Sequence, residues 1–352
     1  MNLKDIRNKI DHLDTQLVSL LQQRMEYALQ AGKHKDTVRD NNREETILNN
    51  VTAHKSTFIE NQFIIDLFRE IMLESRQLQE KKLKLVGFQG EHGAWSEIAI
   101  HKLSQEMVAI PCFEFADVFS GVINEELDCG VVPVENSIEG SVNEVNDLLI
   151  ENDLKITGEI HIPVHHNLLA LPGVDHKEIR AVYSHPQALA QCRAFMSRNK
   201  LEARPFFDTA GAARWLRNEG QRSAGVIASS LAAEIHGLEI VKENIEGHYE
   251  NSTRFLLLSL EEFNGISDKC TISFSTQHQV GALFDVLKVF AEKKINLTRI
   301  ESRPIRKNPG AFGFLIDCQI DENRPNILEA LEHVRKITVD FKNLGFYKGA
   351  LE

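Results

Sequence analysis

The sequence lacks the features that mark membrane, secreted and nucleic-acid-binding proteins. No apolar run approaches the roughly 20 residues that a membrane-spanning helix needs. The five cysteines are odd in number and widely spaced, without a C-x-x-C pair, so they indicate reduced thiols and neither a disulfide framework nor a zinc site. Basic residues number 40 against 51 acidic ones, and the net charge of −11 argues against a nucleic-acid partner. The first residues are charged where a signal peptide would be apolar, so we expect a cytoplasmic protein.

Cofactor motifs are missing as well. The 14 histidines show no metal-ligand spacing, and the chain contains neither a P-loop nor a dinucleotide fingerprint. We therefore expect a protein that works without a metal or a cofactor. A chain of 352 residues with 42% hydrophobic content is long enough for two or three ordinary globular domains.

Proline is absent from residues 1–82, and this segment contains a single glycine. Apolar residues recur every three or four positions from Leu3 to Leu21, which predicts a long amphipathic helix. We expect a second helix near Asp40 and a third that opens with a capping box, Thr57-x-x-Glu60. The pattern therefore predicts an all-α first domain over residues 1–82.

The rest of the chain divides into two segments with different patterns. Residues 83–264 alternate short apolar runs with helical patterns, which predicts an α/β sheet with helices on its faces. Residues 265–352 show the order strand, helix, strand, strand, helix, strand, with a turn at 307–310, which is the ferredoxin-like βαββαβ pattern. We therefore expect three domains.

Three polar runs lie at the ends of apolar strands in the middle segment. They are VVPVENSIEGSV (131–142), AVYSHPQALAQC (181–192) and Asn251-Ser252-Thr253-Arg254-Phe255. In this order they resemble the motifs of prephenate dehydratase, which removes carbon dioxide and water from prephenate to give phenylpyruvate. A further run, Asp208-Thr209-Ala210-Gly211-Ala212, matches another motif of that family. The resemblance implies a two-lobed α/β fold like that of periplasmic binding proteins.

The same resemblance implies roles for single residues in the dehydratase segment. Thr253 would supply the hydroxyl nearest the leaving group, as a donor or relay, since a threonine hydroxyl is a poor acid. Glu135 would be the source of the proton if a closed cleft raised its pKa. Arg254 would position the strand or the cleft. The neutral donors suited to the dianionic substrate would be Asn136, Ser184 and Gln191.

One run departs from the dehydratase pattern. Where many members read G-P-x-G-(S/T)-(F/Y)-S, the chain reads Gly90-Glu91-His92-Gly93-Ala94-Trp95-Ser96. The two glycines and Ser96 remain, so a loop that binds an anion through backbone amides is still expected here.

The predicted helices of residues 1–82 carry polar side chains on faces that should be buried. Arg24 and Lys35 are eleven residues apart, close to three helical turns, so they share a face, whereas Arg7 points about a quarter turn away. Core-facing polar groups need partners. The segment resembles the all-α class of chorismate mutase, and the residues that match its pattern are Arg7, Arg24, Lys35, Asp40, Arg43, Glu44, Ser75 and Gln79.

Chorismate becomes prephenate in one unimolecular pericyclic step, which needs no nucleophile, metal or general base. The enzyme holds the dianion in its reactive conformer and stabilises charge on the breaking ether oxygen. The resemblance implies that Arg7 and Arg24 bind the carboxylates, and that Lys35 and Gln79 donate to the ether oxygen. In the family the first arginine reaches the neighbouring subunit's site, so a homodimer or homotetramer is expected.

The last segment carries two runs that resemble the ACT domain of phenylalanine-controlled dehydratases. Gly281-Ala282-Leu283 opens a helix, and Glu301-Ser302-Arg303-Pro304 ends the next strand. By resemblance these runs bind L-phenylalanine at an interface between two such domains, where a helix N-terminus favours the carboxylate. A plain dimerisation domain without a ligand is the alternative.

The three segments together predict a bifunctional chorismate mutase and prephenate dehydratase of L-phenylalanine biosynthesis, with feedback control by L-phenylalanine. One alternative keeps only the dehydratase and makes the helices a degenerate dimerisation arm without chorismate turnover. Another is a non-catalytic amino-acid sensor, because a two-lobed α/β segment also suits a binding protein.

Overall fold

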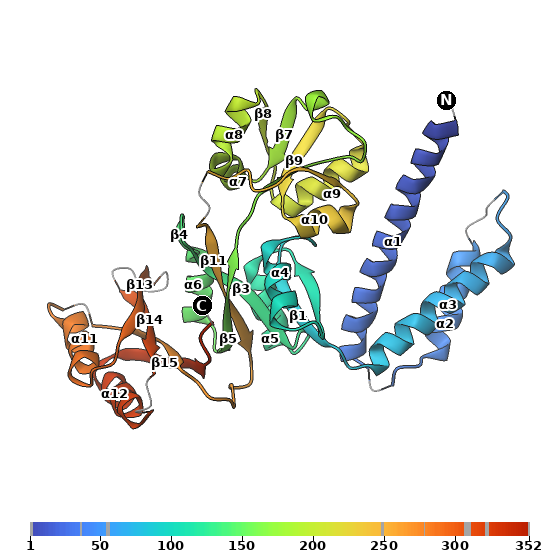
Figure 1. Ribbon diagram of the computed structural model, residues 1–352. Coiled ribbons are helices and arrows are strands. Elements are labelled where there is room, and N and C mark those ends of the chain that lie inside the picture. Colours follow the sequence, from blue (N-terminus) through green and yellow to red (C-terminus); the bar gives the residue numbers. More distant parts are fainter. Residues whose placement is uncertain are drawn as a thin grey trace.

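The chain folds into three units that follow one another in a row, as the computed structural model in Figure 1 shows. The structure describes residues 3–35, 37–53, 57–247, 250–277, 279–305, 311–320 and 324–350, and the turn expected at 307–310 lies outside them. Among the described residues, none of the helices is both long and apolar enough to cross a lipid bilayer.

Three helices form the first unit, as predicted. They are α1 (Leu3–Lys33), α2 (Asn41–Ala53) and α3 (Asn61–Glu80). The helix α3 packs against both others, while the N-terminal half of α1 extends beyond them (Figure 1). The predicted capping box at Thr57 is wrong, because residues 57–59 form a bend and the N-cap residue is Glu60, whose side chain makes no capping hydrogen bond.

The second unit has two lobes, each built on one sheet. The first sheet has the order β2-β1-β3-β11-β5, with the short β4 beside β3. Strand β11 is antiparallel to both β3 and β5, because the chain visits the second lobe and then returns. The elements of this lobe are β1 (Lys84–Gln89), α4 (Trp95–Leu103), β2 (Met107–Cys112), α5 (Phe115–Ile123), β3 (Cys129–Asn136), β4 (Gly140–Ser141), α6 (Asn143–Glu151), β5 (Lys155–Pro163) and β11 (Ser252–Ser259).

The second lobe has a sheet of order β10-β6-β9-β7-β8. Its edge strand β8 is exposed at all four residues, so it lacks the apolar pattern that identifies a buried strand in a sequence. The elements are β6 (Asn167–Ala170), the 3-10 helix η1 (His176–Glu178), β7 (Ala181–Ser184), α7 (Pro186–Gln191), α8 (Arg193–Arg198), β8 (Glu202–Pro205), α9 (Thr209–Glu219), β9 (Ala224–Ala228), α10 (Ser230–His236) and β10 (Glu239–Lys242).

The third unit has the predicted ferredoxin-like order. Its four strands pair as β13-β14-β12-β15, so β13 is an edge strand, and both helices pack over one face of the sheet. The elements are β12 (Lys269–Ser275), α11 (Ala282–Glu292), β13 (Leu297–Pro304), β14 (Phe312–Gln319), α12 (Arg324–Ile337) and β15 (Val339–Tyr347).

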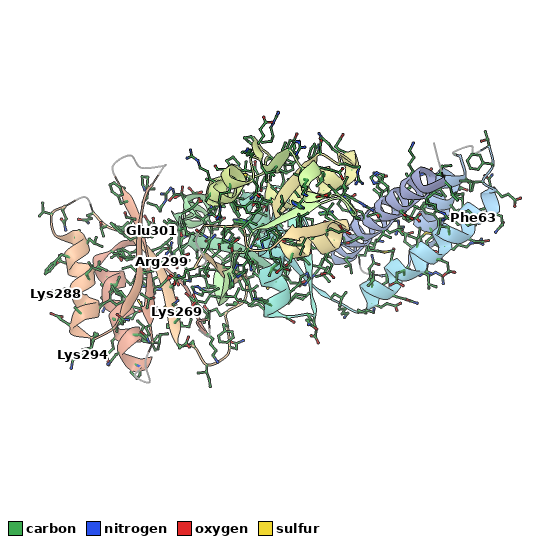
Figure 2. All side chains as sticks on the ribbon, turned by 45° about the horizontal axis from the view of Figure 1, so that its top comes forward. Phe63, Lys269, Lys288, Lys294, Arg299 and Glu301 are labelled. Carbon is green, nitrogen blue, oxygen red and sulfur yellow. The ribbon has the colours of Figure 1, made fainter. Side chains whose placement is uncertain are left out.

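The first lobe joins the other units through a shared core. Leu29 of α1 packs into the core of this lobe from one side, and Leu315 and Tyr347 of the third unit pack into it from the other. The outer ends remain free of the lobe: Phe63 projects from α3 at one end of the molecule and Lys288 lies on α11 at the other (Figure 2). The middle unit is therefore held on both flanks.

Candidate active sites

A cleft of about 420 Å³ lies between the two lobes, and Thr253 is one of the residues that line it. Thr253 pairs with Asn136 across β11 and β3, and Asn136 Nδ2 donates to Thr253 Oγ1 over 2.9 Å. The amide of Asn136 is held in this orientation because its Oδ1 accepts from the backbone of Ile138 and Glu139. The polar residues that line the cleft are Gln89, Ser96, Asn136, His166, His185, Gln187, Gln191, Asp208, Thr209, Asn251 and Thr253.

A line of hydrogen bonds crosses the cleft from lobe to lobe. Asn136 Nδ2 donates to Asn251 Oδ1 over 2.8 Å, and Asn251 Nδ2 donates to Gln191 Oε1 over 3.1 Å. His166 Nε2 lies 2.7 Å from the same Gln191 oxygen, and burial lowers the pKa of His166, so the ring is neutral near pH 7. Asn251 thus links Asn136 to Gln191, and His166 contacts Gln191 as well. The motifs assigned no role to Asn251 or His166.

Two helices begin at the cleft. Trp95 and Ser96 begin α4 and line the cleft, and Thr209 begins α9 opposite them. Such termini favour anions. Asp208 caps α9 by accepting from two backbone amides, and burial raises the pKa of its carboxyl group despite those bonds. It is the single carboxylic acid among the described residues that line the cleft.

The structure places Ser184 and Glu135 outside the cleft, which corrects two expectations. Ser184 is fully buried and donates to the carbonyl of Ile227 over 2.6 Å, so its hydroxyl ties β7 to β9. Glu135 precedes Asn136 on β3, and consecutive side chains of a strand point to opposite faces. Its carboxylate therefore lies behind the sheet, 3.4 Å from Arg254 and 3.4 Å from Arg299.

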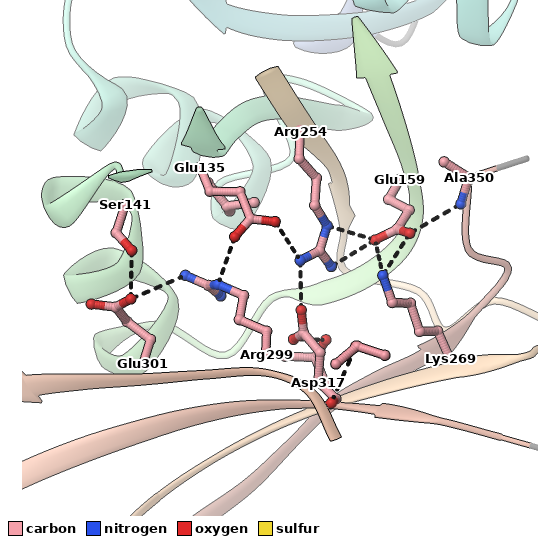
Figure 3. Close-up of polar contacts among 12 residues, drawn as sticks. Glu135, Ser141, Glu159, Arg254, Lys269, Arg299, Glu301, Asp317 and Ala350 are labelled. Carbon is pink, nitrogen blue, oxygen red and sulfur yellow. Dashed lines mark hydrogen bonds and ion pairs between the residues drawn. The ribbon is translucent and has the colours of Figure 1, made fainter. Parts of the chain in front are cut away.

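Arg254 is the centre of a buried ionic cluster behind the cleft (Figure 3). Its side chain is 3% exposed and lies 2.6 Å from Glu159 and 2.6 Å from Asp317 of the third unit. It also donates to the hydroxyl of Tyr347 over 3.2 Å. Burial opposes the charge, but Asp317, Tyr347 and Glu159 outweigh burial and raise the pKa of Arg254. The residue beside catalytic candidate Thr253 is thus bound to the third unit.

Glu301 and Arg303 face the same interface within the chain, whereas the resemblance places them at an L-phenylalanine pocket between two third units. Ser141 Oγ donates to Glu301, and Arg303 holds Asp147 of α6 with two bonds of 2.6 and 3.2 Å. Side chains alternate along β13, so the other two residues of this run, Ser302 and Pro304, lie on its exposed face.

A separate hollow of about 340 Å³ in the third unit includes the glycine-alanine-leucine run. Gly281 is the N-cap residue of α11 and has φ +88°, a backbone conformation that favours glycine. The hollow is lined by Thr276, Gln277, Gln279, Gly281, Ala282, Leu283, Phe284, Phe312 and Phe314.

The helical unit brings together several of its predicted site residues. Arg24 Nη1 donates to Ser75 Oγ over 2.7 Å, and Gln79 Nε2 donates to the carbonyl of Ala28. Burial and the nearby Arg43 guanidinium lower the pKa of Arg24, which indicates two cations converging on one place. Such a pair suits an anionic ligand.

The remaining candidates of the helical unit lie further apart. Lys35 and Asp40 line an open hollow of about 430 Å³, and Asp40 Oδ1 caps α2 by accepting from Arg43 N over 3.0 Å. Glu44 forms an ion pair with Arg76 of α3. Arg7 is exposed on the free half of α1, 17 residues before Arg24, which at 1.5 Å per residue is about 26 Å away. Arg7 therefore cannot join Arg24 within one chain.

Each of the three units matches a known protein family. Family models match residues 6–80 (chorismate mutase type II), 86–263 (prephenate dehydratase) and 271–337 (ACT domain). The bifunctional chorismate mutase/prephenate dehydratase of Aquifex aeolicus is 34% identical over 99% of this chain and 98% of its own.

Two solved structures resemble the second and third units. Prephenate dehydratase of Arthrobacter aurescens in complex with L-Phe is 30% identical, with a TM-score of 0.69 over 75% of this chain and 89% of its own. The structure of GqqA, described as a novel type of quorum quenching acylase, is 32% identical, with a TM-score of 0.70 over 76% of this chain and 98% of its own.

The ionic cluster predicts a large effect of replacing Arg254. Arg254→Met leaves Glu159 and Asp317 buried without their shared cation, so we expect the free energy of unfolding to fall by about 3–5 kcal/mol in urea denaturation. The matched control is Arg69→Gln, because the pair of Arg69 with Asp66 is exposed, and we expect a change below about 1 kcal/mol. Equal changes in the two variants would contradict a structural role of the cluster.

Proposed function

The chain belongs to the family of bifunctional chorismate mutase/prephenate dehydratases and carries both activities of L-phenylalanine biosynthesis, and we propose here which residues perform them. The hydrogen-bonded line from Thr253 through Asn136 and Asn251 to Gln191 carries the dehydratase assignment. It places neutral donors from both lobes around one cleft, and the N-terminus of α4, which has no side-chain cap, favours a dianion there.

Dehydration consumes one proton, because prephenate loses carbon dioxide and its ring hydroxyl departs as water. The bond to the departing carboxylate breaks, and its electron pair completes the aromatic ring as the hydroxyl leaves. Thr253 Oγ1 accepts from Asn136, so its own proton is free to be donated to the leaving hydroxyl. The neighbour of this hydroxyl is an amide and not a base, which suits a donor better than a nucleophile. Asp208, whose pKa burial raises, replaces Glu135 as the proposed acid of the cleft.

Apolar side chains form the remaining walls of the cleft. Val164, Phe207 and Phe255 lie beside the polar line. They present a surface for the substrate ring and exclude water from the reacting atoms, which strengthens the hydrogen bonds around the leaving group.

The helical unit holds chorismate by its two carboxylates in this proposal. Arg24, oriented by Ser75 and close to Arg43, binds one of them. Gln79 donates to the ether oxygen, and so does Lys35, which follows the end of α1 and lines the hollow beside Asp40. The convergence of two guanidinium groups favours an active mutase over a degenerate dimerisation arm, and the donor-lined cleft favours an enzyme over a sensor.

We propose domain boundaries at residues 1–82, 83–264 and 265–352, and a cytoplasmic location. The family models lie within these three ranges. The chain passes from the first unit to the second between α3 and β1. It passes from the second unit to the third in the segment between β11 and β12.

The two activities should be separable by single substitutions. Lys35→Ala should lower mutase activity by about two to three orders of magnitude, the usual loss for one donor to a developing charge, and should spare dehydration of added prephenate. Thr253→Ala should do the reverse. Separate assays from chorismate and from prephenate measure both effects. Equal loss of both activities in either variant would refute the two-site assignment.

We propose a homodimer formed through the helical unit. Along the free half of α1 the apolar residues Leu13, Leu17 and Leu20 are 56%, 59% and 61% exposed, which is a continuous surface that a monomer would leave in water. A second α1 packed along it would cover these residues. The same packing would bring Arg7 of one chain to the site of Arg24 in the other.

Mixed dimers test this shared site. Arg7→Ala and Lys35→Ala subunits should each be inactive as mutases, but a mixed dimer has one site with both defects and one with neither. We expect co-expression of the two variants under different tags to restore up to about half of the normal mutase activity per mixed dimer. Mixed dimers that are isolated by both tags and remain inactive would count against the shared site.

L-phenylalanine acts, in this proposal, through the hollow at the start of α11. Its carboxylate suits the N-terminus of that helix, and its ring suits Leu283 and Phe314. An effector shifts an equilibrium only through its different affinity for two states. The third unit is bonded to Arg254 and Glu135, the neighbours of Thr253 and Asn136, so a shift of this unit acts directly on the strands that carry the donors.

A pocket-filling variant tests the effector site. Ala282→Leu places a larger side chain in the hollow without disturbing Gly281, whose positive φ would strain any replacement. We expect normal dehydratase activity without L-phenylalanine and at least about a tenfold higher concentration for half inhibition, which corresponds to about 1.4 kcal/mol of lost binding. Unchanged inhibition in a variant that folds normally would place the effector elsewhere.

A further inference from the structure

The loop that departs from the family pattern, residues 90–94, follows β1 of the first lobe and contacts the second lobe beside the cleft. Gly90 and Ala94 line the cleft, and the carbonyl of Gly93 accepts from Ser229 Oγ of the second lobe over 2.6 Å. Gly93 has φ +94°, and a Cβ there would lie 2.6 Å from Ala232 Cα. The loop therefore fits closely against the second lobe, and a small displacement changes the wall of the cleft.

His92 of this loop is clamped between two carboxylates. Its Nδ1 lies 2.8 Å from Glu97 Oε1 of α4, and its Nε2 lies 2.9 Å from Glu26 Oε1 of α1. The other oxygen of Glu97 accepts from Gly93 N over 2.6 Å. Nδ1 is hydrogen-bonded to Glu97, whereas Nε2 lies at ion-pair distance from Glu26 and makes no hydrogen bond within the described part of the chain. Two carboxylates facing one ring favour its doubly protonated, positively charged form. The contact between the helical unit and the loop is thus a largely buried ion-pair bridge.

The helix that supplies Glu26 contacts both lobes and the mutase site. Glu26 follows two residues after Arg24, and Leu29 one turn further on packs in the core of the first lobe. In the N-terminal half of α1, which extends beyond α2 and α3, Thr15 Oγ1 accepts from Arg217 of the second lobe over 2.8 Å. The long helix therefore spans the outside of the two lobes whose separation defines the cleft.

The charges around His92 favour its protonated form. Burial opposes protonation, but Glu26 and Glu97 outweigh it and raise the pKa of His92 to about 10. His236 of α10 stays neutral, because burial lowers its pKa to about 4. The other charged or titratable groups nearby are Glu91, paired with Arg214 of α9, and His101, 3.6 Å from Glu97.

The sign of this shift gives the pH dependence of the bridge. The folded protein keeps the proton of His92 above pH 6.5, where an unfolded chain releases it. The bridge therefore contributes its full stability below about pH 6.5, and the contribution declines as pH rises toward about 10.

We propose that His92, clamped between Glu26 of the helical unit and Glu97 of the first lobe, is a positioning residue for dehydration. Through it α1 holds the loop, in which Gly90 and Ala94 line the cleft together with the following residue, Trp95. The inference rests on the proposed dehydratase function of that cleft. A neutral His92 keeps one donor and turns a lone pair toward a carboxylate, so the loop separates from α1 and the substrate-binding wall loses its shape.

Glu26→Gln tests the inference in the full-length protein. The substitution keeps the size of the side chain but removes one carboxylate, which lowers the pKa of His92 toward its ordinary range. We expect KM for prephenate to be close to the wild-type value at about pH 6.5 and to rise about tenfold by about pH 8.5. The change in kcat should stay below about twofold, because the reacting groups of the cleft remain in place. Wild-type KM should not show this rise.

Lys33→Gln is the matched control. Lys33 pairs with Asp128 over 2.5 Å at the same contact between α1 and the first lobe, and neither residue lines the cleft. We expect wild-type KM from this variant at both pH values. A pH-independent KM in Glu26→Gln, or the same rise in both variants, overturns the inference, since docking of the units alone would then explain the result.

Mutase assays separate the remaining outcomes. Normal chorismate turnover in Glu26→Gln, together with the KM rise, supports the bridge, because the helical unit is then folded and active. Loss of mutase activity in parallel with dehydratase activity overturns the inference in favour of general unfolding. A wild-type protein that dehydrates no prephenate refutes the proposed function itself, and the inference with it.

Discussion

The buried charge of Arg254 is the constraint on which the rest of the structure depends. A guanidinium that is 3% exposed is stable only if fixed carboxylates replace the water it has lost. Glu159 and Glu135 come from strands of the first lobe, and Asp317 comes from the third unit, so both units supply carboxylates to this charge. The third unit therefore helps to hold β11, the strand that carries Thr253, in place.

Alternation along strands puts two functions one residue apart. Asn136 and Thr253 face the cleft, whereas Glu135 and Arg254, their immediate neighbours, face the third unit. In the proposed function, an effector bound to that unit acts on the backbone of the donors through these adjacent residues. The first lobe is approached similarly from its other side, because α1 carries a mutase residue and the partner of His92 within one turn. The middle unit is thus in contact with both of its neighbours next to the residues that line the cleft.

The sequence predicts the three fold classes correctly, because each has a distinct local pattern: helical period, alternating strands and helices, or the βαββαβ order. It also brings Thr253, Asn136 and Gln191 to one cleft through motifs at strand ends. The sequence does not predict strand β8, because all four of its residues are exposed and it has no apolar pattern. The placements of Glu135, Ser184, Glu301 and Arg303 differ from expectation because a motif identifies a neighbourhood in the chain and not the face to which each side chain points.

By itself the sequence determined the order of the three units and the motifs that carry the chemistry, since both depend on residue types and spacings along the chain. Only the tertiary structure decided which face of β3 lines the cleft and which meets the third unit. It likewise decided which face of β13 meets the first lobe and which meets solvent, because both depend on what packs against each strand. It also decided that His166 and Asp208 belong to the cleft and that His92 meets Glu26, 66 residues away in the chain. Such contacts join segments that are far apart in the sequence, and no local residue pattern predicts that they meet. Only the packed fold reveals them.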